Sequence, residues 1–238
     1  MIPSTYVWKK ARLSKVELES RILFQQDGLV AIDKPADLPS SGRDLEDPDC
    51  LQYALVTYFG EMVWAVHQLD ADTTGVNLFV REPNLVALWK ERMAVPMGRK
   101  IYLAVVHGSP DFESLRVEEP IGVISEVPHR QLGITPSGKR AVSKVHVLCR
   151  GNKCSLVRVE LETGRTHQIR IHLASLGHPI VGDDWYGPTL SGTHTRQALH
   201  ASRMEFAEGV EPRLIESPLP QDMRELIRSL GLLDGHAS

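Results

Sequence analysis

Residues 141–177 read AVSKVHVLCRGNKCSLVRVELETGRTHQIRIHLASLG and contain two strand patterns followed by a helix pattern. Residues 141–149 and 154–161 predict two strands joined through a Gly-Asn pair, which is typical of a tight hairpin turn. Residues 166–176 predict a helix, because apolar residues recur every three to four positions and Gly177 is a suitable C-terminal cap. A hairpin that runs directly into a helix indicates an α+β fold with a largely antiparallel sheet.

On both sides of this stretch, the rest of the chain also contains patterns for strands and for helices. Breaker-rich loops separate short apolar runs, and no internal repeat is visible. We expect one domain over residues 22–238, preceded by an N-terminal extension over residues 1–21. Further strands are predicted at 22–25, 29–32, 63–66, 76–80, 100–106 and 199–206, and further helices at 51–59, after Pro83 and at 222–230.

The composition is that of an ordinary globular protein. The chain has 238 residues, of which 42% are hydrophobic and 24% are charged, which argues against disorder. No uncharged apolar stretch is long enough to span a membrane, and the first residues do not resemble a signal peptide. Three cysteines, an odd number, exclude a disulfide framework. These features predict a soluble cytosolic protein.

Charge is distributed unevenly along the chain. The net charge is -3, but residues 127–159 contain no Asp or Glu, while acidic residues gather at 44–49 and 205–216. Two interpretations of the basic stretch are equally open: a solvated hairpin, or a surface that binds a polyanion. Its basic residues are Arg130, Lys139, Arg140, Lys144, Arg150, Lys153 and Arg158.

Residues 67–75, HQLDADTTG, place Asp70 in a loop directly after a predicted strand. Functional groups are often held on a loop between rigid strands. The same Asp and Thr residues could instead build an Asx turn, and spacing alone favours that interpretation.

Residues 164–172, GRTHQIRIH, place Arg170 and His167 three positions apart on one side of the predicted helix. An Arg in this position could pair with a carboxylate and lower its pKa, or it could simply be solvent-exposed. A metal site is disfavoured, because His167 and His172 are about 140° apart around a helix.

The predicted strand at 100–106 places Lys100 and Tyr102 on one polar face. The Tyr102 ring could be a platform for a planar base or a half-buried core residue. Cys149 and Cys154 are expected to face each other across the hairpin as reduced thiols.

Taken together and in this order, these stretches resemble the RluA-type RNA pseudouridine synthases. Residues 67–75 resemble the family signature His-Arg-Leu-Asp-x-x-Thr-Ser-Gly, and residues 164–187, GRTHQIRIHLASLGHPIVGDDWYG, match its strongest motif almost throughout. Residues 22–39, 100–108, 138–141 and 196–201 also agree. The chain is identified as a member of this family over about residues 22–230.

The resemblance implies a pseudouridine synthase fold, a mixed and mainly antiparallel sheet flanked by helices with a central RNA-binding cleft. It implies conversion of specific uridines in rRNA or tRNA to pseudouridine by a cytoplasmic monomer, without cofactor, metal or membrane. In the implied site Asp70 is catalytic, Arg170 forms a salt bridge with Asp70, and Tyr102 stacks on the target base. His67, Gln68, Lys100 and Arg165 complete the expected substrate-binding set.

Two residues depart from the family pattern. Gln68 stands where the family usually has Arg, a residue associated with holding RNA open around the flipped base, and Thr74 replaces Ser. Because about 20 residues precede the first predicted strand, we also expect no separate RNA-binding domain there.

The implied reaction accounts for a single essential carboxylate. Cleavage of the bond between ribose and uracil N1 develops positive charge on the sugar, which one carboxylate can stabilise or trap. Uracil then turns and re-attaches through C5. Whether Asp70 attacks the sugar or removes a proton stays open. The alternatives are an RNA-binding protein that keeps the fold with weak or no catalysis, suggested by Gln68, and a metal-dependent hydrolase.

Overall fold

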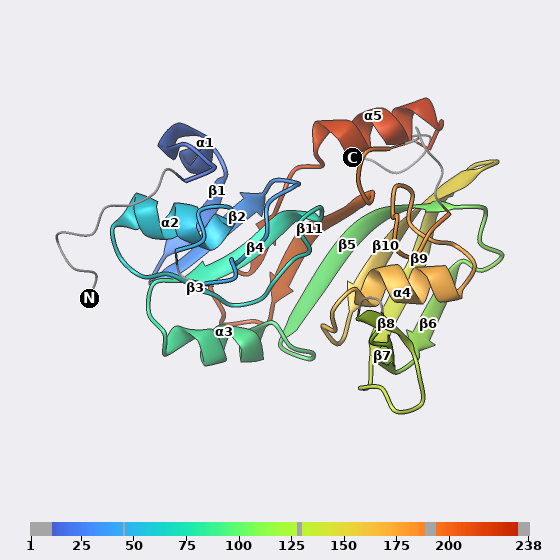
Figure 1. Cartoon of the computed structure of the whole chain (residues 1–238), viewed down its shortest axis with the longest axis horizontal. Helices are drawn as coiled ribbons and strands as arrows, with labels where there is room; N and C mark the ends of the chain where they lie inside the picture. The colour runs from blue at the N-terminus through green and yellow to red at the C-terminus, as the bar shows by residue number, and fades with distance from the viewer. Residues whose placement is uncertain (1–10, 45, 128–129, 189–193, 233–238) are drawn as a thin grey trace. The chain divides into compact units, whose positions relative to one another are not determined.

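The computed structural model of the chain describes residues 11–44, 46–127, 130–188 and 194–232 (Figure 1). Its contacts divide the chain into two compact units. Unit 1 consists of residues 1–98 and 201–218, and unit 2 of residues 99–200 and 219–238. No helix in the described ranges is long and apolar enough to cross a membrane.

Unit 1 is built on an antiparallel arrangement in which β2 lies between β1 and β4. The β1–β2 hairpin turns at Asp27 and Gly28, whose φ angles of 49° and 75° fit the Asp-Gly turn expected from the sequence. The short β3 pairs with β4, and β12 pairs with β11. The elements are α1 (Lys15–Glu19), β1 (Ile22–Gln26), β2 (Leu29–Lys34), α2 (Leu51–Phe59), β3 (Trp64–Ala65), β4 (Thr74–Val80), α3 (Leu85–Arg92), β12 (Leu214–Glu216) and most of β11 (Leu199–Phe206).

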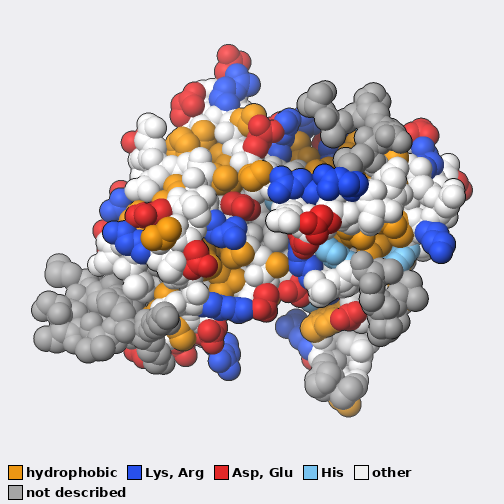
Figure 2. Space-filling view, turned by 90° about the horizontal axis from the view of Figure 1, so that it is seen from above, with side chains coloured by type: hydrophobic (Ala, Val, Ile, Leu, Met, Phe, Trp, Pro, Cys, Tyr) orange, Lys and Arg blue, Asp and Glu red, His pale blue; other side chains and the backbone are white. Residues whose placement is uncertain are grey.

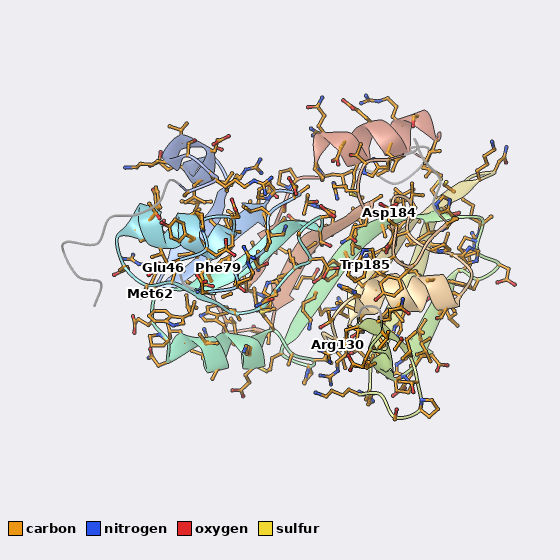
Figure 3. The ribbon with its side chains drawn as sticks, viewed as in Figure 1. Glu46, Met62, Phe79, Arg130, Asp184 and Trp185 are labelled. Atoms are coloured by element: carbon orange, nitrogen blue, oxygen red, sulfur yellow. The ribbon has the colours of Figure 1, made fainter. Side chains whose placement is uncertain are left out.

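Helices cover both faces of the unit 1 strands (Figure 1). Alternate residues of β2 point to opposite sides, so that Val30 and Ile32 pack towards α2 while Leu29 and Ala31 pack towards α3. On the α2 side, Phe79 is fully buried and Met62 packs against the same cluster (Figure 3). Because both faces are covered, every residue of β4 is buried, which gives the strand that follows the Asp70 loop a rigid setting.

Unit 2 contains the antiparallel order β5–β10–β9–β6 and a separate hairpin, β7–β8. Helix α4 packs against that hairpin through a small apolar cluster in which Ile121, Ala141 and Ile171 are buried. The elements are β5 (Gly98–His107), β6 (Ser114–Glu118), β7 (Ile121–Ser125), β8 (Gln131–Ile134), β9 (Val142–Arg150), β10 (Cys154–Leu161), α4 (Gln168–Ser175) and α5 (Gln221–Ser229).

The expected α+β class and the mainly antiparallel sheet are confirmed, but three local predictions are wrong. Helix α4 begins at Gln168 rather than Thr166, because His167 has a left-handed backbone with a φ angle of 55°. Cys149 pairs with Leu156 and not with Cys154, because the turn spans more residues than Gly-Asn alone and shifts the register. The strand β5 lacks a clean polar face, since Tyr102 is buried like its neighbour Ile101.

Candidate active site

The loop that carries Asp70 is anchored on β4 by His67. The ring Nε2 of His67 accepts a hydrogen bond from the main-chain N of Leu78 at 3.1 Å, and its main-chain O accepts one from Asn77 Nδ2 at 3.1 Å. An Nε2 that accepts from a main-chain N–H carries no proton, which fixes the tautomer of the imidazole. His67, expected to bind substrate, therefore makes contacts that hold the start of the loop.

A buried lysine anchors the other end of this loop. Lys34 is fully buried, and its ammonium donates to the main-chain O atoms of Pro35 at 2.8 Å, Leu38 at 2.7 Å and Ala71 at 2.7 Å. Three acceptors use all three protons of the ammonium, as a buried charge requires. The residue after Asp70 is thus tied to the loop that follows β2.

The two loops are also joined by serine side chains. Ser40 Oγ accepts from the main-chain N of Leu69 at 2.9 Å and donates to its O at 3.3 Å. The exposed Gln68, where the family usually has Arg, donates from Nε2 to Ser41 Oγ at 2.7 Å. Gln68 therefore takes part in the same contact between loops, without adding a charge.

Asp70 itself is half-buried at the centre of this anchored loop. Its main-chain O accepts from Thr73 N at 3.0 Å, so that a tight turn leads directly into β4. Gly75 follows with a φ angle of 107°, and a Cβ there would lie 2.2 Å from the main-chain O of Ala201. Only glycine fits where β11 approaches so closely. Sequence reasoning correctly placed Asp70 in a loop between strands.

In unit 2, Arg170 of α4 forms a buried ion pair with Asp183. Nε donates to Oδ2 at 2.7 Å and Nη2 donates to Oδ1 at 2.8 Å, a two-point geometry that fixes the plane of the guanidinium. The main-chain N atoms of Trp185 and Tyr186 also donate to Oδ1. Burial disfavours the charged carboxylate, but Arg170 and these N–H groups outweigh burial, and the pKa of Asp183 lies below its usual range.

Aromatic rings surround this ion pair. The guanidinium carbon of Arg170 lies 5.1 Å from the centre of the Tyr186 ring and 5.7 Å from that of Trp185, within the range of cation–π contacts. His167 Nδ1 is 2.9 Å from the hydroxyl of Tyr186. His167 and Arg170 thus meet the same residue as expected, although His167 lies outside the helix and reaches it from a left-handed backbone.

Tyr102 and Lys100 lie on β5, opposite Val159 and Leu161 of β10. Tyr102 is only 6% exposed. Burial, followed by the nearby positive charge of Arg165, lowers the pKa of Lys100. The exposed Arg165 is oriented by a hydrogen bond from its Nε to the main-chain O of Arg140 at 3.0 Å. The structure therefore brings Lys100 and Arg165 together within unit 2.

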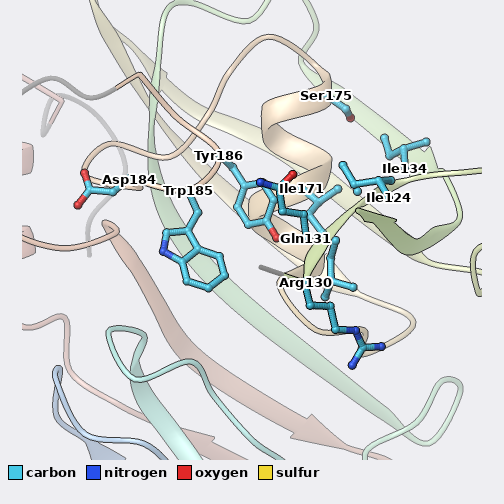
Figure 4. Close-up of a pocket in the computed structure, with 11 residues that line it drawn as sticks. Ile124, Arg130, Gln131, Ile134, Ile171, Ser175, Asp184, Trp185 and Tyr186 are labelled. Atoms are coloured by element: carbon cyan, nitrogen blue, oxygen red, sulfur yellow. The ribbon is translucent and has the colours of Figure 1, made fainter. Parts of the chain in front are cut away.

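Two hollows lie beside the β7–β8 hairpin, and both are lined by residues of unit 2. The first has a volume of about 590 Å³, and we call it the basic groove; its lining includes Arg130, Lys139, Arg165, His167 and Trp185, and no described lining residue is acidic. The second has a volume of about 570 Å³ and is more apolar (Figure 4). It is lined by Ile124, Arg130, Gln131, Leu132, Gly133, Ile134, Ile171, Ser175, Asp184, Trp185 and Tyr186.

Residues 28–175, more than half of the chain, match the sequence model of the family described as RNA pseudouridylate synthase. The chain belongs to the RNA pseudouridylate synthase family. It is 35% identical over 220 residues to the RNA pseudouridine synthase YhcT of Bacillus subtilis, with 89% of this chain and 72% of that protein covered. It is 33% identical over 189 residues to the dual-specificity RNA pseudouridine synthase RluA of Vibrio cholerae, with 78% and 76% covered.

Among solved structures, human RNA pseudouridylate synthase domain containing 4 shares the fold with a TM-score of 0.73. The sequences are 23% identical, and the comparison covers 91% of this chain and 95% of that one. The pseudouridine synthase fold and the RluA-type membership expected from the motifs are thereby confirmed. Membership also implies an isomerase that acts on RNA.

Sequence reasoning missed several residues that build the site. It quoted Asp183, Trp185 and Tyr186 within residues 164–187 and included Lys34 only within residues 22–39, and it assigned none of them a contact in the site. The sequence does place the Asp183 carboxylate in the same motif as Arg170, 13 residues further along the chain. The pairing of the two residues depends on the turn after α4, which the sequence pattern does not define. Within the described residues, no group of three or more His, Cys, Asp or Glu side chains is arranged to hold a metal ion.

Proposed function

We propose that this chain converts specific uridines of RNA to pseudouridine, with Asp70 as the catalytic carboxylate. One observation carries the proposal: the Asp70 loop lies inside the family match and is anchored at both ends by His67 and Lys34. A carboxylate on a loop held this firmly needs little reorganisation as charge develops in the reaction.

The reaction needs no external reactant. The bond between ribose C1′ and uracil N1 breaks, a bond between C1′ and C5 forms, and the C5 proton is lost while N1 gains one. Asp70 stabilises or traps the positive sugar while the uracil turns. Water has to be kept away from that sugar, because its attack would release free uracil. A single carboxylate is therefore sufficient in this proposal, without a cofactor or metal.

Arg170 and Tyr102 complete the proposed site. Following the resemblance, Arg170 pairs with Asp70 and Tyr102 stacks on the target base. The two-point bond between Arg170 and Asp183 supports this role, since it fixes the orientation of the guanidinium. Lys100 and Arg165 are proposed to contact the RNA backbone, and Gln68 to contact RNA without charge. The contacts of His67 support a positioning role in the loop.

The proposed substrate is a ribosomal or transfer RNA, modified in the cytoplasm by a monomer. One residue favours the second candidate, an RNA-binding protein with little catalysis. Gln68 lacks the charge that the family usually places there and hydrogen-bonds to Ser41 instead. Base flipping would then be weakened while the fold and the RNA-binding surface remain.

The decisive test maps pseudouridine in total RNA from cells with and without the gene. We expect at least one uridine to lose the modification, and wild-type protein to restore it. Asp70→Asn should fail to restore it while keeping the fold intact, because only the carboxylate charge is removed. The matched control is Asp111→Asn, an exposed carboxylate of unit 2. An unchanged modification map would favour the binding protein, and rescue by Asp70→Asn would remove Asp70 from catalysis.

A further inference from the structure

The cations of the basic groove have no carboxylate partners among the residues that the structure describes. Arg130, Lys139 and Arg165 are exposed and line the groove, and none of them forms an ion pair within the described parts of the chain. No acidic side chain belongs to the described lining. Three cations around one concave surface whose described lining carries no opposing charge raise the local concentration of anions.

Most other cations of the basic stretch form ion pairs with carboxylates. Arg140 pairs with Glu118 at 2.8 Å and Lys144 with Glu162 at 3.3 Å. Arg158 lies 3.4 Å from Glu160, and Arg150 lies 2.8 Å from Glu113. The three groove cations therefore differ from these four in having no carboxylate partner among the described residues.

An exposed tryptophan forms part of the same lining. Trp185 is 70% exposed, although tryptophan is usually well buried. Its position is nevertheless fixed: its main-chain N donates to Asp183 at 3.0 Å, and its ring meets the His167 ring edge-on, with centres 5.4 Å apart. Figure 4 shows the Trp185 indole and the Tyr186 ring pointing in different directions from neighbouring positions of the chain.

We propose that the basic groove is a binding subsite for a further nucleotide of the bound RNA, beyond the target uridine. The base stacks on the exposed indole of Trp185, and the neighbouring phosphates contact Arg130, Lys139 and Arg165. Stacking on an aromatic side chain accepts any base, so the subsite recognises single-stranded RNA without reading its sequence. That the ligand is RNA rests on the proposed function.

The test measures binding of fluorescein-labelled octauridylate to the full chain at several salt concentrations. Trp185→Ala should weaken binding by about 5- to 100-fold, and Trp185→Phe by less, because a smaller ring still stacks. Lys139→Gln should reduce the slope of log affinity against log salt by about 0.7. Lys153→Gln is the matched control, since Lys153 is an exposed cation of unit 2 outside the groove, and it should leave the affinity nearly unchanged.

Linear polyphosphate of the same charge separates stacking from electrostatics. It should bind more weakly than octauridylate and should be insensitive to Trp185→Ala. Equal loss of both ligands in Trp185→Ala would overturn the stacked base, and so would wild-type octauridylate affinity in that variant. If Trp185→Ala does not fold, wild-type affinity in both Trp185→Phe and Lys139→Gln overturns the subsite, as does the absence of saturable octauridylate binding by the wild type.

The subsite and the proposed function fail separately. If the protein forms no pseudouridine in cells but binds octauridylate through Trp185, the subsite is supported and the proposed enzymatic function is wrong. If Trp185→Ala restores pseudouridine as well as the wild type and binds octauridylate with wild-type affinity, the proposed function is supported and the subsite is wrong.

Discussion

Two regions of unit 2 contain cations of the same basic stretch of sequence but differ in whether those cations are paired with carboxylates. On the strands β6, β9 and β10, Lys144 and Arg116 share Glu162, at 3.3 Å and 3.1 Å. In the basic groove, Lys139 has no such partner among the described residues. Figure 2 shows the same interspersion of acidic and basic side chains over much of one face. A run of like charge along the chain therefore does not predict a charged surface, because neighbouring strands can supply the opposite charge.

The difference concerns recognition more than stability. Exposed ion pairs each contribute only about 0–1 kcal/mol, but they cancel the field that would attract a polyanion. The buried pair of Arg170 and Asp183 belongs to a different class, because neither partner can be solvated if the other is lost.

The largest effect is expected from that buried pair. Arg170→Ala should lower the free energy of unfolding by about 3–5 kcal/mol, because it leaves Asp183 buried and unpaired. Arg158→Ala, which breaks a more exposed pair on the strand face, should cost less than about 1 kcal/mol. Urea unfolding of both variants measures the contrast. Equal costs would show that burial does not distinguish the two regions.

Acidification should lower the stability of unit 2, because it protonates a buried histidine that joins β9 to the segment before β7. His172 is fully buried, with Nδ1 2.9 Å from Ser143 Oγ of β9 and Nε2 3.0 Å from the main-chain O of Glu119, next to β7. Burial lowers its pKa, although the interactions with Glu119 act in the opposite direction. The unfolded chain therefore binds the proton more readily, and this contribution to stability is present above about pH 6.5 and is lost as the pH falls below that value.

Urea unfolding between about pH 7.5 and about pH 5.5 measures this loss. Burial also lowers the pKa values of His107 and His194, which act in the same direction. His172→Gln should reduce the pH dependence without removing it. Constant stability across this range would contradict a neutral buried His172.

A new cation in unit 1 should sharpen the comparison. Gln68→Arg replaces a neutral contact to Ser41 with a charge on an exposed loop, and we expect tighter octauridylate binding with a salt slope steeper by about 0.7. Gln26→Arg, on the exposed end of β1, is the control because Asp27 lies beside it. Indistinguishable slopes for wild type and Gln68→Arg would mean that position 68 does not meet the phosphate backbone.

The smallest effect is expected on the neutralised strand face. Glu162→Gln should change stability by less than about 1 kcal/mol while freeing Lys144 and leaving Arg116 paired with Glu118. If the carboxylates prevent RNA from binding to this strand face, Glu162→Gln should bind octauridylate at low salt modestly more tightly than the control Glu46→Gln. The control removes the same charge from another part of the chain. Identical affinities would show that the strand face lies outside the reach of RNA, whatever its charge.

The sequence predicted the local elements well where periodicity and turn chemistry agree. Helix α2 and strand β10 have the predicted bounds, and the Asp27-Gly28 hairpin has the predicted turn. The α4 start was missed because a left-handed His167 leaves no trace in apolar spacing. Strands β7 and β8 were missed because they are short and partly exposed, with weak alternation.

By itself, the sequence determined the family, the fold class and the position of Asp70 in a loop between strands, because motifs and periodicity are local properties of the chain. Tertiary structure decided which charged side chains are paired, which are buried and which have no partner among the described residues. It paired Arg170 with Asp183, buried Lys34 beneath the Asp70 loop, and left Lys139 without a carboxylate partner among the described residues. These outcomes depend on strand register and on turns that bring distant residues together, and an ion pair or a buried charge exists only once that register is set.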